Sequence, residues 1–288
     1  MKVLIIIVNY NTKELLSNLL FSLFRVLGSK PLRNCDILVI DNNSSDGSRT
    51  IIKAMRKAGL IRAILNTKQM YHAPALNQGL EIAKQEKYDI FWAIDSDVVI
   101  LRQHAVRDAL NSMQSRNIDM MSQYNNAGES HVSCMMLRVS TMEKLQATFL
   151  HGGNPSRYME RHCRRSGAKV RNFPFRSHYY ILHVGCGTRK AIKDLGDTSN
   201  AWFEDIADCS PWYHGDPLAP AIHDNFKQLF MQEIPRITPR AIVKACTKRD
   251  IMQLQLPEES PGPDPKILSP TARGKKALEA KASSLPNS

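Results

Sequence analysis

The sequence lacks the features that mark disulfide-stabilised, zinc-binding and membrane-spanning proteins. Its six cysteines are scattered and form no Cys-x-x-Cys pair, so neither a disulfide framework nor a zinc site is indicated. No apolar run approaches the ~18 residues that a membrane span needs. The apolar run 3–8 is too short for a signal peptide and leads into Asn9 instead of a small-residue cleavage site. We therefore predict a soluble, cytoplasmic protein.

Acidic residues are also in short supply. Lys and Arg number 39 against 27 Asp and Glu, which gives a formal net charge of +12. This excess favours anionic partners such as nucleotide phosphates, an anionic membrane surface or nucleic acid. A nucleic-acid-binding protein is therefore one hypothesis. However, the basic residues are not interleaved with the aromatic side chains that single-strand binding requires, and we expect no nucleic-acid partner.

Strand-like and helix-like segments alternate through residues 1–125. Short apolar runs predict strands, and apolar residues at helical spacing predict helices between them. The expected strands are 3–8, 36–41, 61–65, 90–95 and 118–122, and the expected helices are 13–27, 48–58, 74–86 and 103–115. This alternation predicts βαβ units, and thus an α/β fold with a Rossmann-like, mostly parallel sheet flanked by helices.

The alternation breaks after about residue 125, where we expect a smaller mixed region. This region has strand-like runs at 132–138 and 178–184, a short helix at 139–149, a stretch rich in Gly, Pro and Arg at 152–177, a helix from Pro217 and Pro220 to residue 232, and a basic amphipathic helix at 239–254. Pro, Ser and Lys dominate from Pro257 onward, which is typical of a flexible tail. We therefore divide the chain into 1–125, 126–256 and 257–288.

Two carboxylates, Asp95 and Asp97, follow the apolar run that starts at Ile90. An isolated Asp-x-Asp is more often a solvated turn or a helix N-cap than a metal site. In open α/β sheets, however, ligands bind outside the carboxyl ends of the strands. Polar stretches follow four successive predicted strands, at 9–11, 41–47, 66–77 and 95–97. Together they predict a polar pocket whose carboxylates are the hard ligands that Mg²⁺ and Mn²⁺ prefer.

These stretches resemble the family 2 glycosyltransferases of the GT-A fold. The resemblance lies in residues 8–11, 40–48, 75–80 and 95–97, and it covers residues 1–125, with 126–256 as the acceptor-binding half. It implies a metal-dependent enzyme that moves a sugar from a nucleoside-diphosphate sugar to an acceptor hydroxyl, with UDP as the favoured nucleotide and inversion as the expected stereochemistry. A hexosyl- or N-acetylhexosaminyltransferase with Mn²⁺ or Mg²⁺ is therefore expected.

The resemblance also implies roles for individual residues in the first half. Nucleotide or sugar contacts are implied for Asn9, Tyr10, Asn11, Asp41, Asn43, Asn77, Asp95 and Ser96, with Asp41 accepting hydrogen bonds from the base. Metal coordination is implied for Asp97, together with Asp95. One departure concerns the segment before the Asn77 helix, where relatives commonly show glycines and this chain has residues 68–72, Lys-Gln-Met-Tyr-His.

The second half must then supply acceptor binding and a general base. Glu204 and Asp205 resemble the acidic pair of this family, and Asp205 is our preferred base, although the pair could instead be the exposed first turn of a helix. His214 is a candidate metal ligand, with a packed histidine as the alternative. For His183, at the end of an apolar run, we favour a structural role.

Basic residues in the second half leave further alternatives open. The basic residues between Arg157 and Arg176 could bind a diphosphate or an anionic acceptor. A solvent-exposed helix or loop face is the more ordinary explanation for such a cluster of charges. The 239–254 helix could touch a membrane if the acceptor is lipid-linked, or it could pack against the core. A glycan or a small molecule is an equally open acceptor. A sugar nucleotidyltransferase is the rival enzyme class, but residues 9–12 lack the Gly-rich basic loop that it needs.

Overall fold

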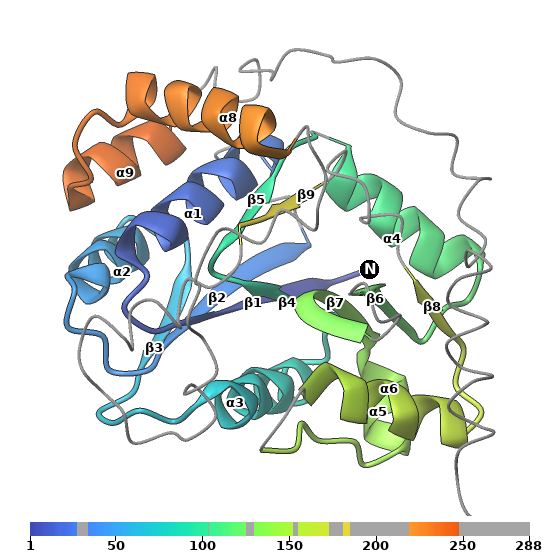
Figure 1. Cartoon of the computed structure of the whole chain (residues 1–288). Coiled ribbons are helices and arrows are strands. Elements are labelled where there is room, and N and C mark those ends of the chain that lie inside the picture. The colour runs from blue at the N-terminus through green and yellow to red at the C-terminus, as the bar shows by residue number, and fades with distance from the viewer. Residues whose placement is uncertain are drawn as a thin grey trace, which may run out of the picture.

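A seven-stranded sheet forms the centre of the protein in this computed structural model, which describes residues 1–27, 34–102, 104–124, 130–151, 155–172, 181–184 and 219–247. The strand order is β3-β2-β1-β4-β7-β6-β8 (Figure 1). The strands are β1 (Val3–Asn9), β2 (Cys35–Asp41), β3 (Arg62–Leu65), β4 (Ile90–Asp95), β6 (Met120–Tyr124), β7 (Ser130–Arg138) and β8 (Val170–Asn172). A second sheet pairs β5 (Val98–Ile100) with β9 (Ile181–His183).

Only β7 runs against the other strands of the larger sheet. β1 pairs in parallel with β2 and β4, β2 with β3, and β6 with β8, whereas β7 is antiparallel to both β4 and β6. The predicted α/β fold with a mostly parallel sheet is therefore confirmed. The reversal also brings the start of β7 to the sheet edge at which β1, β2 and β4 end, because Cys134 pairs with Ile94.

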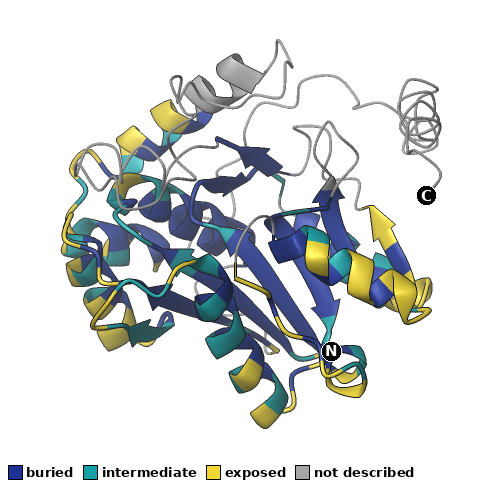
Figure 2. Cartoon of the chain, turned by 60° about the horizontal axis from the view of Figure 1, so that its bottom comes forward, coloured by how far each residue is buried: buried dark blue, intermediate teal, exposed yellow. Residues whose placement is uncertain are grey.

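Helices cover both faces of the sheet, and each face has its own apolar core (Figure 1). One face packs against α1 (Lys13–Leu27), α2 (Ser48–Lys57), α4 (Ala105–Ser115), α8 (Ala219–Glu233) and α9 (Pro239–Cys246). The other packs against α3 (His72–Gln85), α5 (Val139–Lys144) and α6 (Pro155–Arg165). Figure 2 shows the resulting pattern: the central strands are dark blue, the outer strands β3 and β8 are partly or largely exposed, and exposed residues lie on the outer sides of the helices.

The central strand β1 explains why a continuous apolar run is needed. Ile5 and Ile7 point into one core, and Leu4 and Ile6 point into the other, all four fully buried. A strand with helices on both sides has no solvent face, so its sequence does not alternate between polar and apolar residues. The same reasoning applies to β4, whose Trp92 and Phe91 lie on opposite faces.

Helix α3 approaches β1 closely at Gly79. A Cβ atom added there would lie 2.8 Å from Ile6 Cδ1 and 3.1 Å from Ile6 Cγ1 and Cγ2. Because the fully buried Ile6 has little room to move, we expect Gly79→Val to lower the free energy of unfolding by about 1–3 kcal/mol through overpacking. Urea denaturation would measure the loss. Glu81→Val, on the exposed side of α3, is the control, and an equal loss in both variants would contradict close packing as the cause.

The structure differs from the predicted elements mainly after β4. β5 was not predicted, because its three residues directly follow the acidic pair and read as part of the loop. α6 lies in the stretch predicted only to be rich in Gly, Pro and Arg; its apolar residues are few, but Met159 and Cys163 are buried. The short helix predicted at 139–149 ends already at Lys144. Tertiary contacts accompany β5, which pairs with β9, and α6, which packs against β7 and β8, whereas α5 ends just before Gln146, which has a left-handed φ of 49°.

Helix α9 is the described part of the predicted basic helix at 239–254. Its residues Ile242, Ala245 and Cys246 are buried, and the helix packs against α1 and α2. The prediction that the apolar side of this helix packs against the core is therefore confirmed. In the part of the chain that the structure describes, none of the helices combines the length and apolarity needed to cross a membrane. The predicted tail at 257–288 lies outside the described residues.

Candidate functional site

A buried hydrogen-bond network joins the carboxyl ends of β1, β2 and β4. The Asn9 amide donates to Asp41 Oδ1 (2.8 Å) and to Ser44 Oγ (3.0 Å). Thr12 Oγ1 donates to Asn9 Oδ1 (2.7 Å) and lies 2.9 Å from Ser96 Oγ. All five side chains are buried. The network therefore fixes the three loops relative to one another, and Asn9 and Ser96, both predicted to contact the nucleotide, use their polar atoms within it.

Asp41 is the most deeply embedded member of the network. Its Oδ1 accepts from Asn9, its Oδ2 accepts from the Ser44 backbone N–H (3.1 Å) and lies 3.6 Å from Arg49 Nε, and its side chain is fully buried. A buried carboxylate needs such partners, because it has lost its hydration. In this arrangement Asp41 shapes the 41–47 loop. Because this side chain is fully buried, a contact between its carboxylate and a nucleobase, as predicted, would require the surrounding loop to move.

Tyr10, Asn11 and Asn43 are the predicted nucleotide residues that keep solvent access at this edge. Asn11 (φ 51°) and Asn43 (φ 68°) adopt the left-handed conformation, which Asn tolerates better than most residues. Asn11 Oδ1 accepts from the Ser45 backbone N–H (2.7 Å), and Asn43 Oδ1 accepts from Arg49 Nη1 (2.9 Å). Turn residues thus hold both loops in shape while leaving part of each side chain exposed.

Asn77, which is predicted to contact the nucleotide, makes two hydrogen bonds to the backbone of Phe149. Its amide donates to the Phe149 carbonyl (2.9 Å), and its Oδ1 accepts from the Phe149 backbone N–H (2.8 Å). This pair of hydrogen bonds fastens the segment after α5 to helix α3. Asn77 therefore holds the wall of the site in this structure, with both ends of its amide engaged.

The two acids after β4 each face a histidine. Asp95 Oδ1 lies 3.5 Å from His72 Nε2, and Asp97 Oδ1 lies 3.3 Å from His183 Nε2. Burial raises the pKa of Asp95; His72 and His183 oppose the rise, and Asp97 adds to it. Burial alone would lower the pKa of His183, but the nearby Asp97 and Asp95 raise it above its ordinary value. The cluster thus favours an added positive charge.

The small β5–β9 sheet explains how His183 reaches the acids. β5 begins directly after Asp97, and its Val98 pairs with His183 in antiparallel register. The Val184 N–H also donates to the Asp97 carbonyl (2.9 Å). From the sequence we favoured a structural role for His183 and did not expect it to lie beside both carboxylates. Its position depends on the pairing with β5, a strand that was not predicted.

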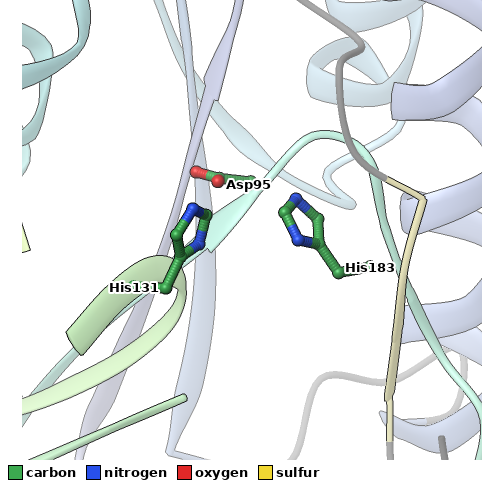
Figure 3. Close-up of side chains that lie close together, drawn as sticks. All are labelled: Asp95, His131 and His183. Atoms are coloured by element: carbon green, nitrogen blue, oxygen red, sulfur yellow. The ribbon is translucent and has the colours of Figure 1, made fainter. Parts of the chain in front are cut away.

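His131 is the third component of a possible metal site, and no sequence signal pointed to it. Its ligand atom and those of Asp95 and His183 all lie within 4.8 Å of one another. Figure 3 shows the three side chains close together, with the Asp95 carboxylate beside the His131 ring. His131 is the second residue of β7, and only the reversed direction of that strand brings it to this edge. Carboxylate and imidazole groups at this spacing suit a divalent transition-metal ion.

Three predicted site residues, Glu204, Asp205 and His214, lie outside the described residues. The described part of the site is therefore the part that is predicted to bind the donor. It combines exposed turn residues after β1 and β2, a rigid buried network beneath them, and an acid–histidine cluster after β4.

A mostly parallel sheet with one reversed strand, bearing an acidic pair at the end of β4, matches the GT-A fold. A sequence model described as glycosyl transferase family 2 matches residues 4–162, which is more than half of the chain. The chain belongs to this family. The predicted resemblance is thus confirmed, and it reaches beyond the first half.

Solved glycosyltransferases support the same fold at low sequence identity. The mannosyltransferase PcManGT from Pyrobaculum calidifontis, in complex with GDP-Man and Mn²⁺, superposes with a TM-score of 0.54 at 12% identity, covering 98% of this chain and 79% of its own. S. aureus TarS 1-349 in complex with UDP gives a TM-score of 0.51 at 15% identity, covering 67% and 64%. No curated protein matches the sequence.

Proposed function

We propose that this glycosyltransferase moves a sugar from a nucleoside-diphosphate sugar, with UDP as the favoured nucleotide, to an acceptor hydroxyl with inversion and with the help of a divalent ion. The observation that carries the proposal is the cluster of Asp95, Asp97 and His183 at the carboxyl end of β4. Ligands of open α/β sheets bind at this edge. The Mn²⁺ and GDP-Man of PcManGT and the UDP of TarS are consistent with such a donor.

Asp95, Asp97, His131 and His183 are the residues that would hold the ion. The two imidazoles favour Mn²⁺ over Mg²⁺, because Mg²⁺ prefers oxygen ligands and imidazole suits transition metals. When bound, such an ion neutralises charge that develops on a departing diphosphate. His131 Nδ1 accepts from the Ser133 backbone N–H (3.1 Å), so its ring proton lies on Nε2. Ligation through Nε2 would therefore require a change of tautomer.

Acceptor activation is proposed for the second half of the chain. Asp205, or Glu204 beside it, would accept the proton of the attacking hydroxyl, and His214 would be an additional ligand to the ion. The acceptor class stays open between a glycan, a small molecule and a lipid-linked molecule. A lipid-linked acceptor would bring the enzyme to a membrane surface, where the exposed Arg240 and Lys244 of α9 could meet anionic headgroups.

Thermal denaturation with UDP, GDP or dTDP, each with and without Mn²⁺, tests the donor site. A nucleotide and metal together at about 100 times the Kd should stabilise the protein by about 2.7 kcal/mol. For a chain of this size we expect an increase in Tm of about 5–10 °C. Asp97→Asn should abolish the increase, because the ion loses a charged ligand.

Asp108→Asn, on the outer side of α4, is the matched control and should keep the full increase in Tm. Equal stabilisation by DNA and by nucleotide would instead favour a nucleic-acid-binding protein. Release of pyrophosphate from a nucleoside triphosphate and a sugar phosphate would favour a sugar nucleotidyltransferase. A donor screen that detects nucleoside diphosphate released by hydrolysis would then identify the nucleotide and the sugar.

A further inference from the structure

Tyr71 holds a backbone conformation that is normally reserved for glycine. Its φ is 60° and its ψ is 177°, a combination that a Cβ atom disfavours. It is the residue before α3. The chain therefore places an aromatic side chain on a backbone conformation that suits glycine.

A network of amides maintains this strained conformation. Asn42 Nδ2 donates to the Tyr71 carbonyl (3.0 Å), and Asn42 Oδ1 accepts from Asn66 Nδ2 (3.0 Å). Asn66 in turn exchanges two hydrogen bonds of 3.1 Å with Gln78. The Tyr71 N–H donates to Gln69 Oε1 (3.0 Å). Strain persists only where the surroundings determine it, and such positions cluster at functional sites.

The Tyr71 ring is both exposed and supported. The residue is 41% exposed, although tyrosine usually buries most of its apolar ring. One neighbour is the imidazole of His151, with ring centroids 4.9 Å apart and planes inclined by 47°. His151 follows the Phe149 segment that Asn77 fastens to α3. The ring is thus backed by the His151 imidazole while part of its surface meets solvent.

The position of Tyr71 links the two ends of the donor site. Its carbonyl is bonded to Asn42, within the loop after β2 that the sequence assigns to the base side. The next residue, His72, faces Asp95 in the acid–histidine cluster. A nucleotide whose diphosphate lies at the acids and whose base lies toward the 41–47 loop would therefore pass Tyr71.

We propose that Tyr71 is a nucleotide-binding residue whose ring, backed by His151, stacks against the nucleobase of the donor. The inference rests on the proposed function, because it assumes a nucleotide donor at this edge. Stacking uses the π-face that every base has, so the contribution should be similar for uracil and guanine. The strained backbone then has a function, since it directs a ring toward the ligand from a position where glycine would present none.

The test compares three variants by calorimetric titration of UDP and of GDP at fixed Mn²⁺, together with the Tm of the ligand-free protein. Tyr71→Gly should lower the affinity for both nucleotides by about 10- to 100-fold, the range that stacking energies give. The Tm of the ligand-free variant should not fall, because glycine adopts this backbone conformation without strain. Tyr71→Phe should bind both nucleotides as the unmodified protein does. Tyr158→Ala, which removes another exposed tyrosine on α6, should also leave both affinities unchanged.

Two results would overturn the proposal. A lower ligand-free Tm with unchanged nucleotide affinity in Tyr71→Gly would show that the ring is structural. Unchanged affinity for UDP and GDP, with weaker binding of UDP-sugars alone, would place the ring against the sugar instead. The failure of the proposed function looks different, because the unmodified protein would then bind no nucleotide in the presence of Mn²⁺.

Discussion

Asp95→Asn is expected to lower the turnover number for donor consumption by about 10²- to 10³-fold, the effect typical of removing one electrostatic contact to a transition state. The substitution preserves size and removes the charge that faces His72 and lies in the same cluster as His131 and His183. The proposed ion would lose a charged ligand, so the negative charge that develops on the departing diphosphate would be less well neutralised. Steady-state release of nucleoside diphosphate measures the effect.

Asp108→Asn is the matched control for this substitution, because Asp108 is an aspartate paired with His104 on the surface of α4. Its turnover number should stay within about twofold of the unmodified enzyme, as is usual for surface changes. Far-UV circular dichroism of both variants would verify that they fold. Full activity of Asp95→Asn with unchanged dependence on Mn²⁺ would remove Asp95 from the mechanism.

Trp92→Ala is expected to produce the largest loss of stability, about 3–5 kcal/mol of unfolding free energy, as for other buried aromatic truncations. Trp92 is fully buried in β4, and its indole N–H donates to Cys134 Sγ (3.2 Å) on β7. Truncation would open a cavity in one core and remove the hydrogen bond between β4 and the reversed strand. Equilibrium urea denaturation measures the change in the unfolding free energy.

Trp92→Phe serves as the comparison, because it keeps an aromatic ring but has no N–H group. It should lose markedly less stability than Trp92→Ala, since most of the buried volume remains. If Trp92→Ala were destabilised by less than about 1 kcal/mol, well below the usual range for core truncation, the packing described for this face would be wrong.

The parallel half of the fold could be predicted because its evidence is local. Each of β1, β2 and β4 is an apolar run buried on both faces, and helical spacing between them is visible in the sequence. The elements that were missed, β5, α6 and β8, depend on distant partners: β5 pairs with β9, β8 pairs with β6, and α6 packs against β7 and β8. No local pattern records such contacts, so periodicity could not find them.

The candidate site shows the same division. Asp95 and Asp97 were identified because strand-terminal acids can be read from the sequence, whereas His131 and His72 were not, since each gains its position from tertiary structure. For Asp41, the sequence predicts a place at the pocket but not its hydrogen bonds. The structure shows that both carboxylate oxygens accept hydrogen bonds from the protein itself.

The pairing of β5 with β9 determines when during synthesis His183 can join the two acids. Once residue 172 has left the ribosome, every strand of the seven-stranded sheet is present, and so are both aspartates. His183 arrives later and joins through a contact that spans more than eighty positions of the chain. Closing so long a loop costs entropy before the contact is made. A nascent chain would therefore gain His183, one of the residues proposed to hold the ion, only after all seven strands of the larger sheet have been synthesised.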